Sequence, residues 1–484
     1  MGIAQIRDEM LGLLGSDAVI STGAQLRTYE CDGLTGYRVR PALVVLPTTT
    51  QEVAAVVRAC RRDGVPYVAR GSGTGLSGGA LPHADGVLVV LSRMRSILHV
   101  DVENRYLVAE PGVTNAAISA AVARHDLYYA PDPSSQIVCS IGGNVAENSG
   151  GVHCLKYGFT TNHVLGLEFV TPDGDIVELG GAVPDTPGYD LRGVVIGSEG
   201  TLGIATRVIV RLLRRPEAVE TLLADFDTPR EAGDAVTAIT TAGITPAGME
   251  MMDNLAIQAC EEDAQVGLDL EAGAVLVVEL DGPEAEVSAL FGEVQRHCEE
   301  AGATNIRVAA DAAERALIWR GRKAAFAAMG RLSRDYFVQD GVIPRTRLGE
   351  VLERIGEMSD EAGYRVANVF HAGDGNLHPL VLYDGRNAGE AEEAEQLSIR
   401  IVELCVEAGG SITGEHGVGA DKACSMPKMF GEEDLAVMQR VRAAFDPGGI
   451  CNPGKLFPTP RLCGERPGPY RPHAIEQAGL AERL

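Results

Sequence analysis

The chain has 484 residues, 45% of them hydrophobic and 23% charged, which is typical of a soluble globular protein of two or three domains. Its formal net charge of −25 disfavours binding to a phosphate backbone, so we expect no nucleic-acid partner. No apolar run reaches the ~18 residues of a membrane span, and the first residues lack the pattern of a secretory signal. The ten cysteines include no CxxC pair, which argues against a zinc knot or iron–sulfur cluster and favours reduced thiols in the cytoplasm.

The first clear secondary-structure pattern is a strand, a helix and a second strand. Residues 42–47 form a short apolar strand, and Thr49 with Glu52 forms a capping box before a helical periodicity. Gly64 ends this helix, and residues 66–70 return to a strand pattern. The sequence therefore predicts a βαβ unit of ordinary length.

The rest of the chain divides by composition. Further strands are predicted at residues 87–91, 106–110, 165–171, 176–179, 204–213 and 274–280. We expect four segments: a helical lead-in at 1–38, a first domain at 39–216, a second at 217–456 and a tail at 457–484. The boundary follows from Arg214-Arg215-Pro216, after which Ala/Glu-rich helical stretches alternate with strands. The Pro-rich, charged tail is expected to lie on the surface or to be disordered.

A glycine loop, RGSGTGLSGG, follows the second strand at residues 70–79 and contains a G-x-G-x-x-G pattern. A dinucleotide-binding Rossmann turn would need a helix directly after it and then a strand ending in an acid. Only seven residues separate the loop from the strand at Val87, whereas a parallel crossover takes about a dozen, and that strand ends without an acid. The loop instead suits a nest of backbone N–H groups around a pyrophosphate; the alternative is a purely structural glycine loop.

Two more segments are rich in glycine and small polar residues, PDPSS at 131–135 running into SIGGNVAENSGG at 140–151, and GSEGTLGI at 197–204. In this order the three motifs resemble the FAD-linked oxidases that include glycolate oxidase flavin subunits and the D-lactate and D-2-hydroxyglutarate dehydrogenases. The resemblance covers roughly residues 20–456. It implies an α+β protein: a two-lobed FAD-binding domain of the vanillyl-alcohol oxidase type, followed by an α+β substrate or cap domain.

The resemblance also implies which residues hold FAD. The pyrophosphate would lie against Gly71, Ser72, Gly73, Thr74, Gly75 and Ser77. The isoalloxazine and ribityl part would lie against Pro131, Ser135, Gly142, Gly143 and Asn144, with Asn452 near the ring. The adenosine half would meet Glu199, Gly203 and Ile204. Because the glycine loop has neither the His nor the Cys to which some relatives attach flavin, we expect non-covalent FAD.

Two histidines flank a Gly-Asp-Gly-Asn turn within residues 368–383, a strong hairpin signal. His371 would close the first strand and His378 would open the second, so the two imidazoles should lie side by side. Glu415, in a glycine-flanked Glu-His pair, is the candidate carboxylate. Two imidazoles and a carboxylate are common ligands of a divalent metal, here expected to be Zn²⁺; the alternative for each histidine is a satisfied core position.

The family resemblance assigns roles to these residues. It implies that His371, His378 and Glu415 ligate the metal, that His416 is the catalytic base, and that Asn376 contacts the substrate. A metal that holds the substrate hydroxyl would lower its pKa, His416 would remove the proton, and the Cα hydride would pass to flavin N5.

The substrate carboxylate needs a cation, and Trp319-Arg-Gly-Arg-Lys323 is the best basic cluster. By resemblance Arg322 grips the carboxylate; Lys323 is a second candidate, and a solvated basic helix face is the alternative. The 2-hydroxyglutarate enzymes add a Thr and a Lys for a distal carboxylate, and here the corresponding positions are Phe326 and the uncharged residues 336–339. This departure favours a short monocarboxylate.

The resemblance implies oxidation of glycolate or D-lactate to the 2-oxo acid, with electrons passed to a quinone or a partner subunit. The alternatives are a D-2-hydroxyglutarate dehydrogenase, an inactive flavin-binding subunit, and a metal hydrolase with a structural nucleotide. Expected partners are a second flavin-type subunit and an iron–sulfur subunit. The expected location is the cytoplasm, at most peripheral to the inner face of the plasma membrane.

Overall fold

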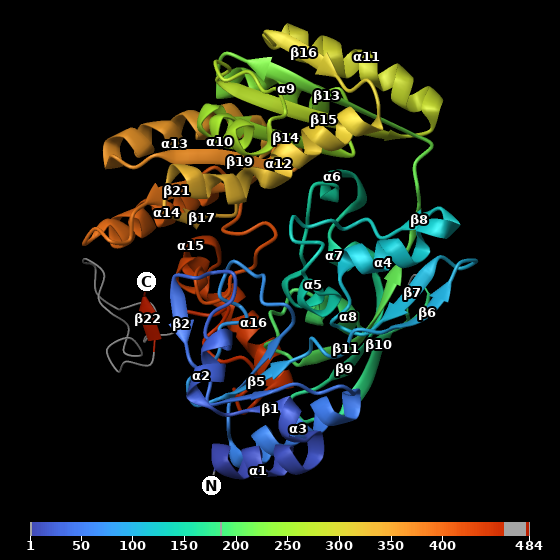
Figure 1. Ribbon diagram of the computed structural model, residues 1–484, viewed down its shortest axis with the longest axis vertical. Coiled ribbons are helices and arrows are strands. Elements are labelled where there is room, and N and C mark those ends of the chain that lie inside the picture. Colours follow the sequence, from blue (N-terminus) through green and yellow to red (C-terminus); the bar gives the residue numbers. More distant parts are fainter. Residues whose placement is uncertain (1, 184–185, 459–480, 484) are drawn as a thin grey trace. The chain divides into compact units, whose positions relative to one another are not determined.

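The computed structural model describes residues 2–183, 186–458 and 481–483. The chain forms two compact units: unit 1 comprises residues 1–151, 159–215 and 415–484, and unit 2 comprises residues 152–158 and 216–414 (Figure 1). The chain enters unit 2 at Pro216, where the composition changes. Residues 152–158 precede this boundary in the sequence but belong to unit 2. Lys156 of this segment pairs there with Asp281, with 2.6 Å between Nζ and Oδ1. The chain also returns to unit 1 at residue 415, well before the expected boundary at 456.

Unit 1 contains short helices and two main sheets among its described residues. Its helices are α1 (Ile3–Leu14), α2 (Gly23–Leu26), α3 (Thr50–Asp63), α4 (Asn115–Val122), α5 (Ile141–Glu147), α7 (Thr160–His163), α8 (Leu191–Val195), α15 (Met426–Met429) and α16 (Glu432–Phe445). Its strands are β1 (Val19–Ile20), β2 (Tyr37–Val39), β3 (Leu43–Val45), β4 (Tyr67–Arg70), β5 (Val87–Val90), β6 (Ile97–Asp101), β7 (Tyr106–Ala109), β8 (Leu127–Tyr128), β9 (Val164–Val170), β10 (Ile176–Gly180), β11 (Ile204–Arg211), β12 (Leu213–Arg214) and β22 (Ala481–Arg483).

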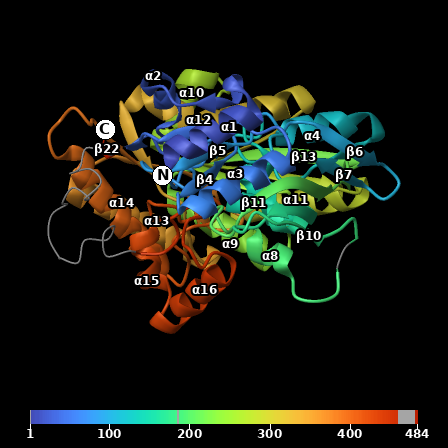
Figure 2. The same ribbon diagram turned by 90° about the horizontal axis from the view of Figure 1, so that it is seen from below.

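The two main sheets of unit 1 are its two lobes. One has the order β1-β3-β5-β4, and the other is an antiparallel sheet of order β10-β9-β11-β7-β6. The helix α3 begins as predicted, because the Thr49 hydroxyl accepts the Glu52 N–H, and it ends at Gly64 with a φ of 63°. Its buried face packs with α1 against β3 and β5 (Figure 2).

The connection from β4 to β5 contains no helix. The two strands are nevertheless parallel, with Tyr67 opposite Val87. The seven residues after the glycine loop are too few for a crossover, but the loop itself supplies the remaining length. The exclusion of a Rossmann turn therefore stands, and the glycine loop with the residues after it carries the chain from the end of β4 to the start of the parallel strand β5.

Unit 2 is built on one large sheet. Its helices are α6 (Cys154–Tyr157), α9 (Pro229–Thr241), α10 (Asn254–Ala264), α11 (Glu284–Glu300), α12 (Ala312–Leu332), α13 (Leu348–Ala362) and α14 (Glu390–Glu407). Its strands are β13 (Ala218–Phe226), β14 (Gly248–Asp253), β15 (Ala274–Gly282), β16 (Asn305–Val308), β17 (Asp335–Val338), β18 (Gly341–Val342), β19 (Val366–His371), β20 (Asn376–Leu377) and β21 (Pro379–Tyr383).

Both faces of the unit 2 sheet are covered by helices. The main path of the sheet is β16-β13-β15-β14-β19-β20-β18, and all its pairings are antiparallel. Successive residues of a strand enter different cores: Leu222 packs with α9 and α11, whereas Leu223 packs with α10 and α12. This two-sided burial explains why β15 is an almost continuous apolar run rather than an alternating one.

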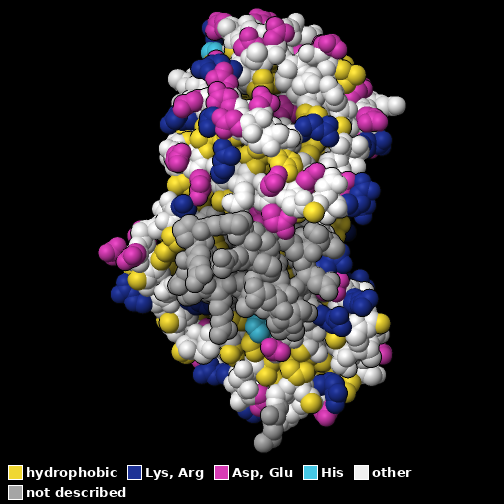
Figure 3. Space-filling view, turned by 90° about the vertical axis from the view of Figure 1, so that its left-hand side faces the viewer, with side chains coloured by type: hydrophobic (Ala, Val, Ile, Leu, Met, Phe, Trp, Pro, Cys, Tyr) yellow, Lys and Arg dark blue, Asp and Glu magenta, His cyan; other side chains and the backbone are white. Residues whose placement is uncertain are grey.

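Three further observations concern the hydropathy of the helices, the cysteines and the surface charge. No helix within the described ranges is long and apolar enough to cross a membrane. Among the cysteines that the structure describes, eight are free thiols and Cys424 is disulfide-bonded, which departs from the expectation of uniformly reduced cysteines. Acidic side chains are interspersed with basic ones over the face drawn in Figure 3.

Candidate active site

The three glycine-rich motifs converge on one cavity in unit 1. The cavity has a volume of about 1270 Å³ with its open mouth included. Twelve of the residues expected to hold FAD line it: Gly71, Ser72, Gly73, Thr74, Gly75, Ser135, Gly142, Gly143, Asn144, Glu199, Gly203 and Ile204. Its walls are therefore made largely of glycine backbone and small polar side chains, a surface on which a pyrophosphate and a flat ring can approach the main chain closely.

Close packing explains why glycine begins the loop. A Cβ atom on Gly71 would lie 2.1 Å from the Ser140 hydroxyl oxygen, so a side chain there would have to displace the Ser140 hydroxyl at the start of α5. The helix α5 is itself held next to Pro111 by a 2.8 Å hydrogen bond from the Gly142 N–H to the Pro111 carbonyl. These contacts bring the first two motifs to the same wall.

Three residues of the expected FAD set do not line the cavity: Ser77, Pro131 and Asn452. Ser77 and Asn452 are almost completely buried behind the wall. The Asn452 side-chain amide donates to the carbonyls of Gly79, at 2.9 Å, and Glu199, at 2.6 Å. Asn452 therefore joins two of the glycine motifs through their backbones.

A pair of buried carboxylates lies at the cavity, and only one of the two was expected there. Glu199 accepts the N–H groups of Val418 and Gly419, at 2.6 and 2.7 Å. Glu147 lines the same cavity, and its Oε2 has no hydrogen-bond partner among the described residues. Burial and the neighbouring Glu199 raise the pKa of Glu147 well above its usual value. Burial raises the pKa of Glu199 as well, although its two backbone donors oppose that shift, so the pair favours binding a proton.

Further charges are buried behind the glycine loop. The Lys455 ammonium donates to the Leu81 carbonyl at 3.0 Å, and burial lowers its pKa to about 8. Asp32 accepts the N–H groups of Leu34, at 3.0 Å, and Ala80, at 3.3 Å, and burial raises its pKa to about 6. Asp32 and Lys455 thus hold the two residues that directly follow the loop, Ala80 and Leu81, at the cost of desolvating a charge.

The raised pKa of Asp32 predicts a pH dependence of stability. Because its folded pKa of about 6 exceeds the ordinary value of 3.8, Asp32 contributes stability that is fully present below pH 4 and is lost as the pH rises through 6. Asp32→Asn should remove this loss, so the difference in unfolding free energy between wild type and variant should shift by about 2 kcal/mol from pH 4 to pH 7. Urea denaturation at saturating FAD measures it. The exposed Asp17→Asn should show no such shift, and parallel curves for Asp32→Asn and wild type would contradict the prediction.

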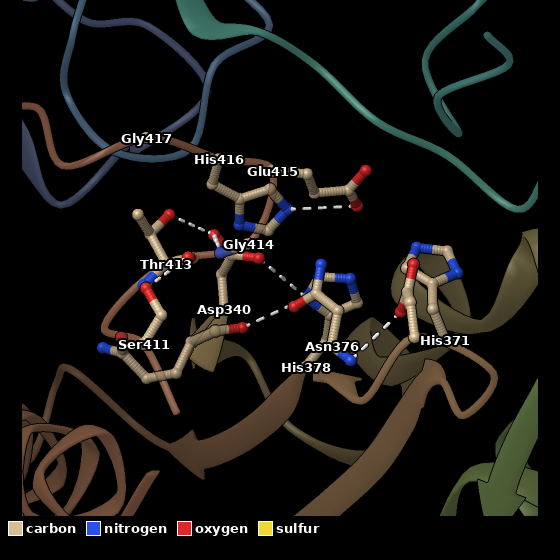
Figure 4. Close-up of polar contacts among 12 residues, drawn as sticks. Asp340, His371, Asn376, His378, Ser411, Thr413, Gly414, Glu415, His416 and Gly417 are labelled. Atoms are coloured by element: carbon tan, nitrogen blue, oxygen red, sulfur yellow. Dashed lines mark hydrogen bonds and ion pairs between the residues drawn. The ribbon is translucent and has the colours of Figure 1, made fainter. Parts of the chain in front are cut away.

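Glu415 and His416 lie on the wall of the same unit 1 cavity. Their side chains are close, with 3.9 Å between His416 Nε2 and Glu415 Oε1 (Figure 4). The next residue, Gly417, has a φ of 85°, and a Cβ there would lie 2.4 Å from Glu147 and 2.9 Å from Glu199. Glycine is required because the backbone passes directly over the two carboxylates, and Glu199 then holds the two N–H groups that follow. The two hydrogen bonds to Glu199 therefore hold the backbone that directly follows His416 against the cavity wall.

The predicted histidine hairpin is present in unit 2. His371 ends β19 and pairs with Asn376 across a tight turn. The His371 and His378 rings are 5.1 Å apart between centroids, at an angle of 85° (Figure 4). His378 lies just before β21 rather than opening it. The sequence-predicted juxtaposition of the two imidazoles is thus observed.

Both rings have their Nδ1 atoms directed at acceptors. His371 Nδ1 is 2.7 Å from Glu250 Oε1, and His378 Nδ1 is 3.3 Å from the Gln339 carbonyl and 3.8 Å from Asp340 Oδ1. An acceptor at Nδ1 favours the tautomer with the proton on that nitrogen, which leaves the lone pair on Nε2. Neutral imidazoles with Nε2 lone pairs are the form that binds a divalent metal.

Arg322 is the buried cation of unit 2. It is 3% exposed on α12, and its Nη2 lies 2.6 Å from Glu250 Oε2. Its Nε is buried without a hydrogen-bond partner among the described residues, which leaves one edge of the guanidinium able to receive an anion. The second candidate, Lys323, is exposed on the other side of the helix. The solvated-face alternative therefore does not apply to Arg322.

Asp340 anchors the end of unit 2. Its Oδ2 accepts the Gly414 N–H, at 3.0 Å, and the Thr413 hydroxyl (Figure 4). Gly414 is the residue before Glu415 in the chain. Asn376, 2% exposed, has an Oδ1 atom without a hydrogen-bond partner among the described residues.

Sequence reasoning missed Glu147, Glu250 and Asp340. Glu250 had a recognisable signal, because it is the one acidic residue within the otherwise apolar stretch GMEMM, and a charge in a buried strand needs a partner. Its partners, His371 and Arg322, are distant in sequence and could not be inferred.

Comparison with known proteins agrees with this arrangement. Residues 41–180 match the "FAD binding domain" family, and residues 215–456 match "FAD linked oxidases, C-terminal domain". The chain is 51% identical to glycolate oxidase subunit GlcD of Escherichia coli strain K12, over 95% of this chain and 91% of that protein. It is 32% identical to a D-lactate dehydrogenase of Anaerostipes hadrus, over 87% and 90%.

A solved structure shares the fold. The 4-ethylphenol oxidase from Gulosibacter chungangensis superposes with a TM-score of 0.78 at 20% identity, over 94% of this chain and 97% of that one. The expected α+β fold of the vanillyl-alcohol oxidase type is confirmed. From the matching domains, the relatives and the converging motifs, we conclude that this FAD-binding chain belongs to the family of FAD-linked oxidases that contains the glycolate oxidase subunits and the D-lactate dehydrogenases.

Proposed function

We propose that the chain oxidises a small 2-hydroxy acid, glycolate or D-lactate, to the 2-oxo acid with FAD as the hydride acceptor. The observation that carries the proposal is the position of His416, an imidazole base on the wall of the cavity lined by the three glycine motifs. The similarity to a glycolate oxidase subunit and to a D-lactate dehydrogenase supports the substrate class.

The unit 1 cavity fits FAD because its wall is glycine backbone with few side chains in the way. Residues 71–75 would hold the pyrophosphate, and Gly142, Gly143 and Asn144 would face the ring. Bound FAD would supply the hydride acceptor, N5. The chain's own part is to exclude water, through the close glycine contacts, and to hold His416 against that wall.

A divalent metal would be held by His371, His378 and Glu415. The fit rests on the donor set: two imidazoles whose Nδ1 atoms face acceptors, and a carboxylate that follows the anchored Gly414 in the chain. When bound, such a metal would orient the substrate and acidify its hydroxyl. Arg322 would hold the substrate carboxylate through its free edge, Asn376 would contact the substrate, and His416 would remove the hydroxyl proton.

Phe326 supports a short substrate. Its ring lies 5.8 Å from that of His378, and its carbonyl accepts the Tyr336 hydroxyl at 3.0 Å. A second carboxylate reaching this position would meet an apolar ring in place of a donor, which disfavours 2-hydroxyglutarate.

The test is anaerobic bleaching of the flavin by a panel of glycolate, D- and L-lactate, and D- and L-2-hydroxyglutarate. We expect fast bleaching by glycolate or D-lactate and slow bleaching by both hydroxyglutarates. Fast bleaching by D-2-hydroxyglutarate would favour that dehydrogenase instead, and a colourless protein would favour the hydrolase.

We also propose non-covalent attachment of FAD. The glycine loop has no His or Cys, and burial raises the pKa of the Cys139 thiol on the cavity wall, which suppresses the nucleophilic thiolate. Acid precipitation should therefore release FAD into the supernatant. Cys139→Ser is the matched control and should release it equally. A yellow precipitate from wild type alone would indicate a link at Cys139, and release of FMN would contradict the pyrophosphate assignment.

Electrons must leave the reduced flavin, and we propose a quinone or a partner chain as the acceptor. The Escherichia coli relative is a glycolate oxidase subunit, which supports a heteromer, here proposed to contain a second flavin-type and an iron–sulfur subunit. We propose a cytoplasmic location, at most peripheral to the membrane. Co-purification from the native host would test the assembly.

A further inference from the structure

We infer that Glu250 is a positioning residue that fixes Arg322 and His371 relative to each other through its single carboxylate. The inference rests on the proposed function, which makes Arg322 the substrate-carboxylate site and His371 a metal ligand. It adds the residue that joins these two sites.

The geometry divides the two oxygens of Glu250 between two partners. Oε1 lies 2.7 Å from His371 Nδ1, and Oε2 lies 2.6 Å from Arg322 Nη2. The three side chains are buried, with exposed fractions of 1% for Glu250, 3% for Arg322 and 8% for His371. They come from β14, α12 and β19, and Glu250 is directly opposite His371 in the sheet register.

The backbone makes this carboxylate a rigid spacer. Glu250 sits in the middle of β14, which is hydrogen-bonded to β15 on one side and to β19 on the other. A carboxylate is planar, so the position of its two oxygens sets both the tilt of the imidazole and the approach of the guanidinium. A shift of either partner is therefore transmitted to the other through one side chain.

The charges explain why this residue is an acid. Burying a guanidinium without a counter-ion is costly, and Glu250 supplies that counter-ion. The same carboxylate accepts the Nδ1–H of His371, which fixes the tautomer and raises the basicity of Nε2 as a ligand. A neutral amide could do only half of this: its oxygen could accept from one partner, and its N–H₂ would face a donor on the other.

Glu279 offers a matched control in the neighbouring strand. It is 6% exposed on β15 and accepts hydrogen bonds from the Thr221 hydroxyl, at 2.7 Å, and the Trp319 indole, at 2.5 Å. A third partner is His153, whose Nε2 lies 3.3 Å from Glu279 Oε1. Like Glu250, Glu279 is a buried carboxylate with partners from several elements, but it contacts neither His371 nor Arg322. Glu279→Gln therefore reports the general cost of neutralising a buried acid in this sheet.

The experiment titrates Zn²⁺ into metal-stripped, FAD-loaded protein and separately measures the KM for glycolate. Glu250→Gln should weaken Zn²⁺ binding by about 10–100-fold, the usual effect of removing a partner that orients a ligand, and should raise KM. Its FAD content should match wild type, because the FAD motifs lie in unit 1. Glu279→Gln should change neither value, even where it lowers the melting temperature. Glu250→Asp keeps the charge one methylene shorter and should fall between wild type and Glu250→Gln.

The outcomes separate the inference from the proposed function. If wild type binds Zn²⁺ tightly and both Glu250 variants bind it equally well, the inference is overturned and the ligand set stands. If Glu250→Gln and Glu279→Gln weaken Zn²⁺ binding equally, Glu250 is only a structural counter-ion, and the inference is also overturned. If wild type binds no Zn²⁺, the proposed ligand set fails first and the inference fails with it. Should Glu250→Gln not fold, the decision passes to Glu250→Asp.

Discussion

Replacing His416 with alanine is expected to slow flavin reduction by about 10²–10⁴-fold, the usual contribution of a general base. His416 lies on the cavity wall, and the backbone that follows it is held there by the hydrogen bonds from Val418 and Gly419 to Glu199. FAD content should stay near wild type, because the glycine motifs that hold it are unchanged. Anaerobic stopped-flow mixing with glycolate or D-lactate measures the rate.

The exposed His125, also in unit 1, provides the control, and His125→Ala should reduce its flavin at the wild-type rate. Metal analysis of the His416 variant separates the alternatives. Slow reduction with metal retained supports a base. Metal lost together with the rate would make His416 a ligand, and near-normal reduction would locate proton removal elsewhere.

Replacing His378 with alanine is expected to lower bound metal and activity together. The ring is 1% exposed and its Nδ1 faces the Gln339 carbonyl, so its Nε2 is the nitrogen available to a metal. A metal that orients and acidifies the substrate is worth several kcal/mol, which predicts a loss of about 10²–10⁴-fold in kcat. Elemental analysis and flavin absorbance of the same sample check the two contents.

FAD should stay bound to the His378 variant, because its motifs lie in unit 1. His297→Ala, at a half-buried histidine on α11 outside the cluster, should keep both metal and activity. Full metal content in His378→Ala would remove His378 from the ligand set, even if the activity fell.

The local elements could be predicted because local forces determine them. The helix α3 begins at a hydroxyl cap and ends at a left-handed glycine, and both signals lie within a few residues of the bond they make. The Gly-Asp-Gly-Asn turn likewise brings His371 and His378 together through short-range geometry. The glycine motifs predicted a cavity wall, since several small residues in one loop leave backbone exposed to a ligand.

The sequence by itself therefore determined both ends of α3, the side-by-side placement of His371 and His378, the cavity motifs and the family. Only the tertiary structure decided the partners of buried charges: Glu250 between His371 and Arg322, and Asp340 beneath Gly414. It also decided that β4 and β5 are parallel, and that Ser77 and Asn452 lie behind the cavity wall. The physical reason is common to these cases: desolvation makes a buried polar group take whichever partner the packing of distant segments supplies, and no local pattern encodes that partner.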